Sequence, residues 1–272
     1  MAAQQQHHFR TLSEEHGPFH IIGDVHGCFD ELQLLLKQLG YTVAFDEQVQ
    51  RYVTTVPGSY KVIFVGDLVD RGPNSPEVLR LVMDMMEQGV AYCVSGNHDD
   101  KLYRMLLGHD VQIRHGLELT AAQLEPYDQA FRQRLIDFLG SLPHHLVLDD
   151  ERLVVAHAGL EEHLHKRNSK GVRALCLYGP TTGGKDERGL AVRLDWAAEY
   201  CGKAVVVYGH TPVHVPSWRN NTINIDTGCV FGGTLTALTY PEYALTEVPA
   251  LKKYAESVRP FILYPQHAPH SS

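Results

Sequence analysis

Asp67, Asp70 and Arg71 lie within five residues of one another, directly after a short apolar run. The run, residues 62–65, is mostly β-branched and stops at Gly66, a pattern that predicts a buried strand. Two carboxylates and a guanidinium at the end of such a strand suit a site that holds a metal ion and an anion together. An internal ion pair in a strand-to-helix turn would explain the same three residues, so the remaining sequence has to separate the two interpretations.

Polar side chains that could join this group follow four other predicted strands. Asp24 and His26 come after residues 19–22, Asn97 and His98 after residues 90–94, His157 after residues 153–156, and His210 after residues 205–208. A histidine taken alone is more often a core residue than a ligand. The carboxyl ends of parallel strands, however, meet at one edge of an α/β sheet. We therefore expect these clusters to converge on one site.

Amphipathic helices connect the first three of these strands. The leucines between Leu32 and Leu39 fall on one helical face that ends at Gly40, and residues 76–88 show a second such face. Strand, helix, strand, helix, strand is the order of a layered α/β fold.

The remaining segments are predicted to belong to the same domain. Residues 99–140 predict a helical insert, and residues 161–190 predict a polar, glycine-rich loop over the site. Three closing antiparallel strands are expected within residues 222–248. We expect one domain over residues 18–272, preceded by a flexible lead-in at residues 1–17.

The amino-acid composition limits the kinds of partner and compartment that we expect for this protein. The 272 residues carry a formal net charge of −8, which argues against binding of a nucleic-acid polymer as the main role. The cysteine count is odd, at five, and no C-x-x-C pair occurs, which favours reduced thiols in a cytoplasmic protein. No signal peptide or membrane-spanning run is visible, so we expect a soluble protein, with a monomer favoured.

The converging side chains form a set of metal ligands. Carboxylate, imidazole and amide oxygen together suit Mn²⁺, with Fe, Zn or Ni as alternatives. The six ligands predicted are Asp24, His26, Asp67, Asn97, His157 and His210. Six ligands suit two ions better than one, and Asp67 on the central strand is the natural bridge between them. A hydroxide held by both ions would attack phosphorus in a phosphorylated substrate.

Three residues beside this set are predicted to act on the substrate. Arg71 would hold the phosphate oxygens, with Asn97 also near the phosphate. His98, held protonated by Asp70, would donate a proton to the leaving oxygen. The alternative for Asp70 is a helix cap or an ion pair with Arg71.

Five motifs in order resemble one known family. G-D-V-H-G (23–27), G-D-L-V-D-R-G (66–72), G-N-H-D (96–99), H-A-G (157–159) and G-H-T (209–211) resemble the phosphoprotein phosphatase (PPP) branch of the metallo-dependent phosphatases. The resemblance implies the α/β metallo-dependent phosphatase fold, a central β-sandwich flanked by helices, with a dinuclear Mn²⁺-type centre.

The C-terminal motifs narrow the resemblance. Residues 178–179, 208–212 and 225–233 are similar to a bacterial subgroup that includes the phosphatase module of polynucleotide kinase-phosphatase and stand-alone dinucleoside-tetraphosphate hydrolases. There, the residue matching Asp226 lies beside the metal site and tunes it. Eukaryotic relatives carry a second phosphate-binding arginine, for which Arg188 is the candidate here, with Arg173 and Arg193 as alternatives.

These features predict a metal-dependent phosphoester hydrolase. The first interpretation is a serine/threonine-type phosphoprotein phosphatase or phosphomonoesterase. The alternative is a dinucleoside-tetraphosphate (Ap4A) hydrolase or a 2′,3′-cyclic nucleotide phosphatase, and a third hypothesis is a catalytically inactive, metal-dependent scaffold. Substrate choice is expected to reside in residues 99–140 and 161–190, where no motif is readable.

Overall fold

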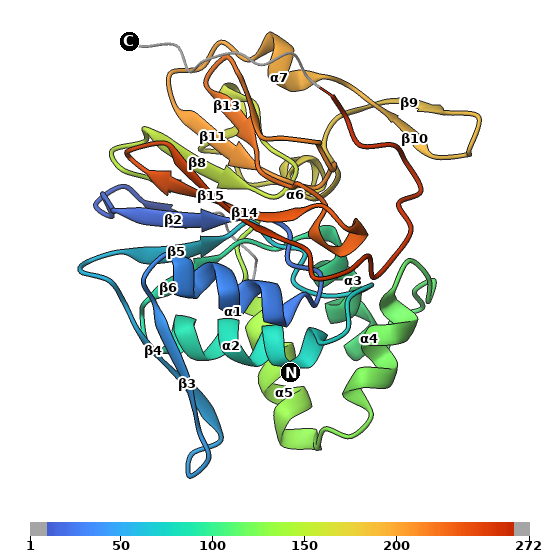
Figure 1. Ribbon diagram of the computed structural model, residues 1–272. Coiled ribbons are helices and arrows are strands. Elements are labelled where there is room, and N and C mark those ends of the chain that lie inside the picture. Colours follow the sequence, from blue (N-terminus) through green and yellow to red (C-terminus); the bar gives the residue numbers. More distant parts are fainter. Residues whose placement is uncertain (1–9, 264–272) are drawn as a thin grey trace.

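The computed structural model describes residues 10–263. Two β-sheets stack face to face, and helices cover their outer faces (Figure 1). The first sheet has the order β15-β14-β2-β5-β6 and the second β1-β7-β8-β11-β13-β12. This arrangement confirms the predicted sandwich flanked by helices.

The first half of the chain contains both strands and helices. They are β1 (Arg10–Leu12), β2 (Phe19–Ile22), α1 (Phe29–Gln38), β3 (Thr42–Asp46), β4 (Arg51–Thr55), β5 (Lys61–Phe64), α2 (Ser75–Glu87), β6 (Ala91–Cys93), α3 (Asn97–Leu106), α4 (Leu117–Leu124) and α5 (Gln129–Ser141). Strands β2, β5 and β6 are parallel, as the predicted βαβαβ order requires.

Strands dominate the second half. Its elements are β7 (His145–Leu148), β8 (Leu153–Ala156), η1 (Glu162–Leu164), α6 (Lys170–Tyr178), β9 (Thr181–Lys185), β10 (Ala191–Arg193), α7 (Trp196–Glu199), β11 (Val205–Tyr208), β12 (Ser217–Arg219), β13 (Thr222–Asn224), η2 (Cys229–Phe231), β14 (Thr234–Tyr240) and β15 (Ala244–Pro249). Among these, β8, β11 and β13 run parallel, and β14 pairs antiparallel with β2.

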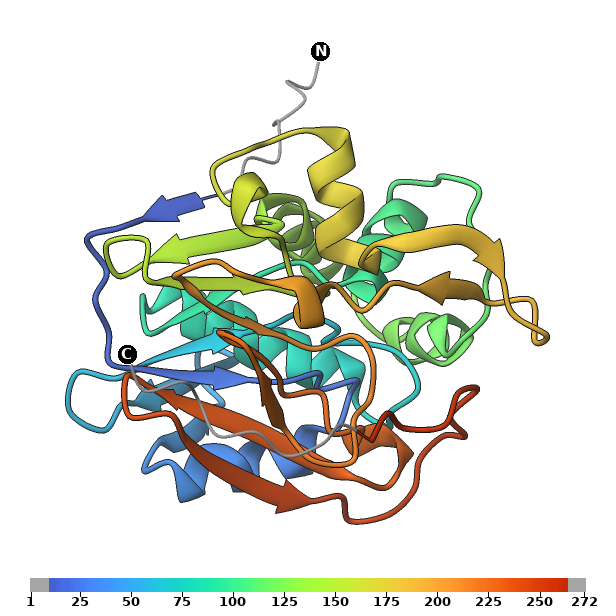
Figure 2. The ribbon, with the colours of Figure 1, turned by 90° about the horizontal axis from the view of Figure 1, so that it is seen from above.

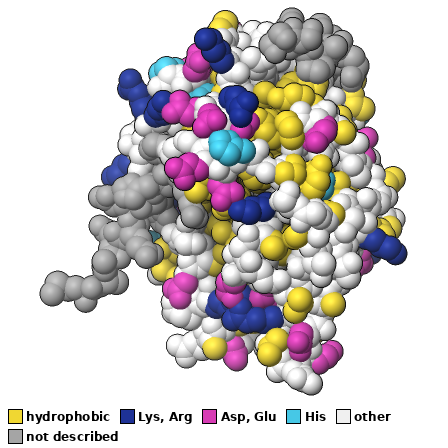
Figure 3. Space-filling view, turned by 90° about the vertical axis from the view of Figure 1, so that its left-hand side faces the viewer, with side chains coloured by type: hydrophobic (Ala, Val, Ile, Leu, Met, Phe, Trp, Pro, Cys, Tyr) yellow, Lys and Arg dark blue, Asp and Glu magenta, His cyan; other side chains and the backbone are white. Residues whose placement is uncertain are grey.

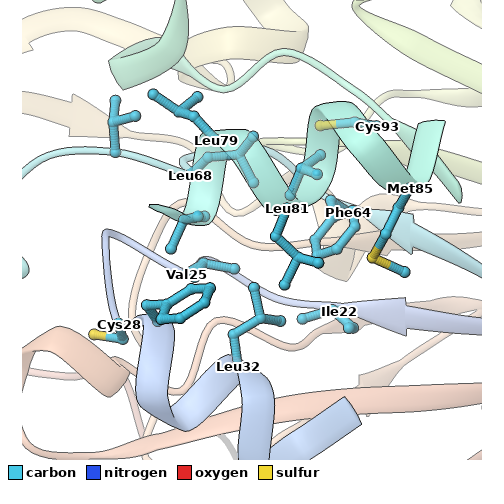
Figure 4. Close-up of a cluster of buried hydrophobic side chains, with 14 of the residues drawn as sticks. Ile22, Val25, Cys28, Leu32, Phe64, Leu68, Leu79, Leu81, Met85 and Cys93 are labelled. Atoms are coloured by element: carbon cyan, nitrogen blue, oxygen red, sulfur yellow. The ribbon is translucent and has the colours of Figure 1, made fainter. Parts of the chain in front are cut away.

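Apolar side chains fill the space on both faces of the first sheet. Phe19 and Ile21 of β2 point between the two sheets, and Ile22 points to the other side. There it packs with Phe64 and with Leu32 of α1 against α2 (Figure 4). Burial on both faces explains why the strands preceding the polar clusters are continuous apolar runs rather than alternating ones.

Three predictions about segments need correction. Residues 161–190 are not a loop: Ser169 caps α6, and Val172 and Cys176 bury one face of that helix. The strand near residue 222 is antiparallel to β12 but parallel to β11. Within the predicted lead-in, residues 10–12 form β1, an edge strand whose backbone pairs with β7. Residues 1–9 and 264–272 lie outside the described residues.

Two further observations concern possible partners. Within the described residues, no helix is long and apolar enough to cross a membrane. On the face in Figure 3, the coloured Lys and Arg side chains are interspersed with Asp and Glu rather than gathered into a continuous basic surface.

Candidate functional site

The loops after β2, β5, β6, β8 and β11 meet on the side of the sandwich where α4 and the β9–β10 hairpin project (Figures 1 and 2). Two groups of buried ligand-type atoms form there, and within each group the atoms lie within 4.8 Å of one another. One group is His26, Asp67 and His98, and the other is Asp67, His157 and His210. Asp67 belongs to both groups, so its carboxylate lies at the centre of the cluster.

Hydrogen bonds to the backbone fix the orientation of two histidines. His26 Nδ1 donates to the carbonyl of Val69 at 2.6 Å, and His157 Nδ1 donates to the carbonyl of Val65 at 3.1 Å. A carbonyl can only accept, so Nδ1 carries the proton in both rings. The Nε2 atoms therefore face Asp67 Oδ2, at 3.5 Å from His26 and 3.4 Å from His157.

Acceptor atoms crowd around His157 Nε2. The carbonyl-type oxygen Oδ1 of Asn97 and the Nδ1 atom of His210 each lie 3.1 Å from it. Asn97 is the first residue of α3, and His210 follows β11. Several lone pairs directed at one point are the donor set expected around a cation.

Asp24 and Asp226 bring two more carboxylates to the cluster. Burial, Asp226 and Asp67 together raise the pKa of Asp24, whose carboxylate accepts a hydrogen bond from His210 N at 3.1 Å. Burial raises the pKa of Asp226 to about 6. Despite its burial, Asp67 has a lowered pKa because His157 and His98 lie beside it. Buried carboxylates this close together favour a compensating cation.

The backbone is strained where the clusters meet. His26, Asp67, Asp70, Arg71 and His210 all have positive φ, between 45° and 74°. Such angles are uncommon for residues with a side chain and cluster at functional sites. No local sequence signal predicts them, because the tertiary contacts impose them.

Gly96 allows two of the loops to touch. A Cβ atom on Gly96 would lie 2.2 Å from both Asp67 N and Asp67 Oδ1. Any side chain at residue 96 would therefore push the loops of Asp67 and Asn97 apart.

His98, Asp70 and Thr120 form a buried chain of hydrogen bonds. His98 Nδ1 lies 2.6 Å from Asp70 Oδ2, and Thr120 Oγ1 donates to Asp70 Oδ1 at 2.7 Å. Asp70 N donates to Thr120 Oγ1 at 3.0 Å. Asp70 thus orients His98. Asn74, not Asp70, directly precedes α2, and no ion pair joins Asp70 to Arg71 within the described residues.

Arg71 extends across the same side of the cluster. Its guanidinium lies 2.5 Å from His26 Nε2 and 2.8 Å from His98 Nε2, and 5.2 Å from the centre of the Phe231 ring. A guanidinium has five donors and no acceptor, so both imidazole nitrogens accept. The group is placed to hold an anion beside His98.

Of the three candidates for a second arginine, Arg193 is the one beside the cluster. Its charge interacts with Asp226, Asp67 and Asp24. Burial and Arg259 lower its pKa to about 10, so it stays charged at neutral pH. Within residues 10–263 its guanidinium has no hydrogen bond or ion pair.

The other two arginines are engaged elsewhere. Arg188 lies at the exposed turn of the β9–β10 hairpin and donates to the carbonyl of Val258 at 2.7 Å. Arg173 of α6 pairs with Asp100. The structure thus places Arg193 rather than Arg188 beside the cluster, because the motif position of Arg188 says nothing about how the hairpin folds.

Sequence reasoning missed Thr120 and Asp99. Thr120 sits in an apolar helical window about 50 residues from Asp70, so no local signal indicates its contact. Asp99 accepts hydrogen bonds from Leu68 N and Gly96 N, each at 2.9 Å, and so ties two site loops together. Its place directly after Asn97 and His98 could have indicated this role.

A small cavity adjoins His210. Arg193, Tyr178, Trp196 and Tyr208 line it together with the backbone around Thr211. Trp196 and Tyr208 pack with ring centroids 5.1 Å apart. Tyr178 is 46 % exposed, so its ring is open to a ligand.

The layered fold and the donor cluster at one sheet edge define a metal-dependent phosphoesterase. Comparison with known families agrees: the calcineurin-like phosphoesterase (Metallophos) profile matches residues 17–214. The chain belongs to this family. It is thus a hydrolase of phosphoester bonds, and the fold implies divalent metal ions at the cluster.

Individual relatives are similar in sequence to most of this chain. The asymmetrical bis(5′-nucleosyl)-tetraphosphatase PrpE of Anoxybacillus flavithermus is 48 % identical over 249 residues, which cover 89 % of this chain and 99 % of the relative. The protein of the same name from Geobacillus sp. (strain WCH70) is 46 % identical over 246 residues, 89 % of this chain and 98 % of that one.

Solved structures share the fold. One, assigned provisionally as a diadenosine tetraphosphatase, has a TM-score of 0.63 at 26 % identity and covers 89 % of this chain and 98 % of its own. A protein serine/threonine phosphatase from Saccharomyces cerevisiae has a TM-score of 0.61 at 17 % identity, covering 94 % and 86 %. The second likeness concerns the fold alone.

Proposed function

We propose that the protein hydrolyses dinucleoside tetraphosphates asymmetrically, giving a nucleoside monophosphate and a nucleoside triphosphate. The observation that carries this proposal is the 48 % identity, over 89 % of the chain, to an asymmetrical bis(5′-nucleosyl)-tetraphosphatase. From the sequence, a phosphoprotein phosphatase ranked first and this activity second. The relatives support the second interpretation better.

The donor set fits two divalent ions. We assign Asp24, His26, Asp67, Asn97, His157 and His210 as their ligands, with Asp67 shared because it belongs to both groups. Mixed carboxylate, imidazole and amide ligands favour Mn²⁺, with Fe, Zn and Ni as alternatives. When bound, the ions would act as Lewis acids toward a phosphoryl oxygen and toward water.

The protein's own side chains supply binding and a proton. Arg71 and Arg193 approach the cluster from different loops and would hold the oxygens of one phosphoryl group between them. Asp70 holds His98 through Nδ1. His98 Nε2, which accepts from Arg71 in this structure, would carry the proton that the leaving oxygen needs once Arg71 holds the phosphate instead. Asp226 would influence the cluster through its charge.

The aromatic cavity beside His210 supports a nucleotide substrate. Tyr178 and Trp196 line this cavity with rings on which a nucleobase could stack, while Tyr208 is buried and packs on Trp196. Base stacking on aromatic side chains tolerates different bases. This cavity is the feature of the geometry that favours nucleotides over phosphoproteins.

The test compares three substrates on one preparation. Enzyme stripped of metal and reloaded with Mn²⁺ is given a dinucleoside tetraphosphate, a phosphoserine peptide and 2′,3′-cyclic AMP. We expect the tetraphosphate to be cleaved at least tenfold faster than the others, and an Asp67→Asn control to bind less Mn²⁺ and lose turnover. Faster cleavage of the peptide would restore the phosphatase interpretation.

A further inference from the structure

A group of cationic side chains lies beside His98, on the opposite side of Asp67 from His210. Lys101 follows Asn97 by four residues on α3, so both lie on one face of that helix. Lys101 Nζ donates to the carbonyl of Arg114 at 2.9 Å. We call Lys101 and Arg114 the α3 cationic cluster, and His115 follows Arg114 in the same loop.

This cluster is held against the phosphate-binding arginine. His115 and Gly116 have positive φ, and a Cβ atom on Gly116 would lie 2.3 Å from Arg71 N. The loop carrying Arg114 and His115 therefore packs directly on Arg71, and only glycine permits this approach.

The charges around the cluster favour an anion. Lys101 faces Arg114 and Arg71 as well as Asp70 and Glu118. His115 faces Arg114, Lys101, Arg71 and His98. Asp70 is already bound to His98 and Thr120, and Glu118 accepts from Gly116 N at 3.2 Å. In a chain with a net charge of −8, this local excess of positive charge stands out.

The position of the cluster relative to His98 decides what it binds. His98 is the proposed proton donor, so the leaving group departs on the His98 side of the metal-ligand group. The α3 cationic cluster packs on Arg71, which contacts His98 Nε2 at 2.8 Å, while Arg193 and the aromatic cavity adjoin His210. A leaving group that carries further phosphates would meet Lys101 and Arg114.

Resting on the proposed function, we infer that the α3 cationic cluster binds the triphosphate part of the substrate, so that water attacks the phosphorus next to the opposite nucleoside. The oxygen of water bonds to that phosphorus. The bond from phosphorus to the oxygen bridging it to the next phosphate breaks, and that oxygen leaves with the triphosphate and takes the His98 proton. The products are a nucleoside monophosphate containing the water oxygen and a nucleoside triphosphate.

Isotope labelling tests the direction of attack. The Mn²⁺-loaded full-length enzyme is given diadenosine tetraphosphate in H₂¹⁸O, and the products are separated and weighed by mass spectrometry. We expect the label in AMP. Label in ATP would mean that AMP is the leaving group and would overturn the inference while leaving the proposed function intact. No cleavage at all would remove the proposed function and the inference together.

Substitutions test the cluster itself. In Lys101→Ala and Arg114→Ala we expect the ratio of kcat/KM for the tetraphosphate to kcat/KM for p-nitrophenyl phosphate to fall about tenfold, the value of one charged hydrogen bond. The inhibition constant of inorganic tripolyphosphate should rise by a similar factor. Lys37→Ala, on the exposed end of α1, is the matched control. An unchanged ratio and an unchanged inhibition constant in both variants would contradict the assignment.

Discussion

At the scale of single residues, the pair of His98 and Asp70 has the most specific predicted role. If His98 protonates the leaving oxygen, its loss should matter most for poor leaving groups. We expect His98→Asn to lower kcat by about 10²–10⁴-fold for an alkyl phosphate, and by much less for p-nitrophenyl phosphate, whose leaving group needs no proton. The two substrates measured side by side check this. Equal losses on both would show that His98 acts in binding instead.

Thr120 is expected to act only through Asp70. Thr120→Val removes a buried donor to Asp70 Oδ1 and an acceptor for Asp70 N. Asp70 N still has Ser75 Oγ as an acceptor at 3.2 Å, but Asp70 Oδ1 loses its donor, which should cost about 1–3 kcal/mol of unfolding free energy. Denaturant unfolding and kcat for the alkyl phosphate measure the two effects, and Thr120→Ser, which keeps the hydroxyl, should recover both. A Ser variant as impaired as Val would show that the hydroxyl alone does not account for the role of Thr120, because Ser lacks only the methyl group that Val retains.

At the scale of elements, the β9–β10 hairpin presents its two arginines differently. Arg193 at the end of β10 reaches the site, and Arg188 at the turn does not. We expect Arg193→Ala to lower kcat/KM for the tetraphosphate by about 10–100-fold, because a charge-assisted contact to phosphate is lost. Arg188→Ala should stay within about twofold of wild type. Steady-state kinetics of the two variants tests this prediction. A larger loss of kcat/KM in Arg188→Ala than in Arg193→Ala would make Arg188 the second phosphate-binding arginine.

Some elements of the fold could be predicted from the sequence and others could not. The strands before Asp24, Asp67 and His157 were predictable because each is an apolar run stopped by polar residues. Helix α6 was missed because it is only 9 residues long and a glycine-rich stretch, residues 179–189, follows it directly. The contact of Thr120 with Asp70 depends on how the helical insert packs, and no periodicity encodes it.

At the scale of the whole molecule, buried neutral histidines should make stability depend on pH. His145 on β7 is 1 % exposed, and its Nε2 donates to the carbonyl of His165 at 2.8 Å. Burial lowers its pKa from 6.5 to about 4. Between these two values the unfolded chain binds a proton that the folded chain does not. The contribution of His145 is therefore fully present above pH 6.5 and is lost as the pH falls toward 4.

His145→Gln separates this effect from other acid effects, since glutamine can keep an amide donor near Nε2 but does not titrate. One such group changes the unfolding free energy by about 1.4 kcal/mol per pH unit, or about 2 kcal/mol between pH 6.5 and 5. We expect metal-free wild type to lose more stability than the variant over this interval, by up to that amount, in urea unfolding at pH 7.5 and pH 5. His20, whose pKa burial also lowers to about 4, remains in both proteins, so the variant should retain part of the pH dependence. Equal losses of unfolding free energy in the two proteins would contradict this prediction. His145 would then be neutral in the unfolded chain at pH 5, or protonated in the folded one. In either case its burial on β7 would have no part in the acid sensitivity.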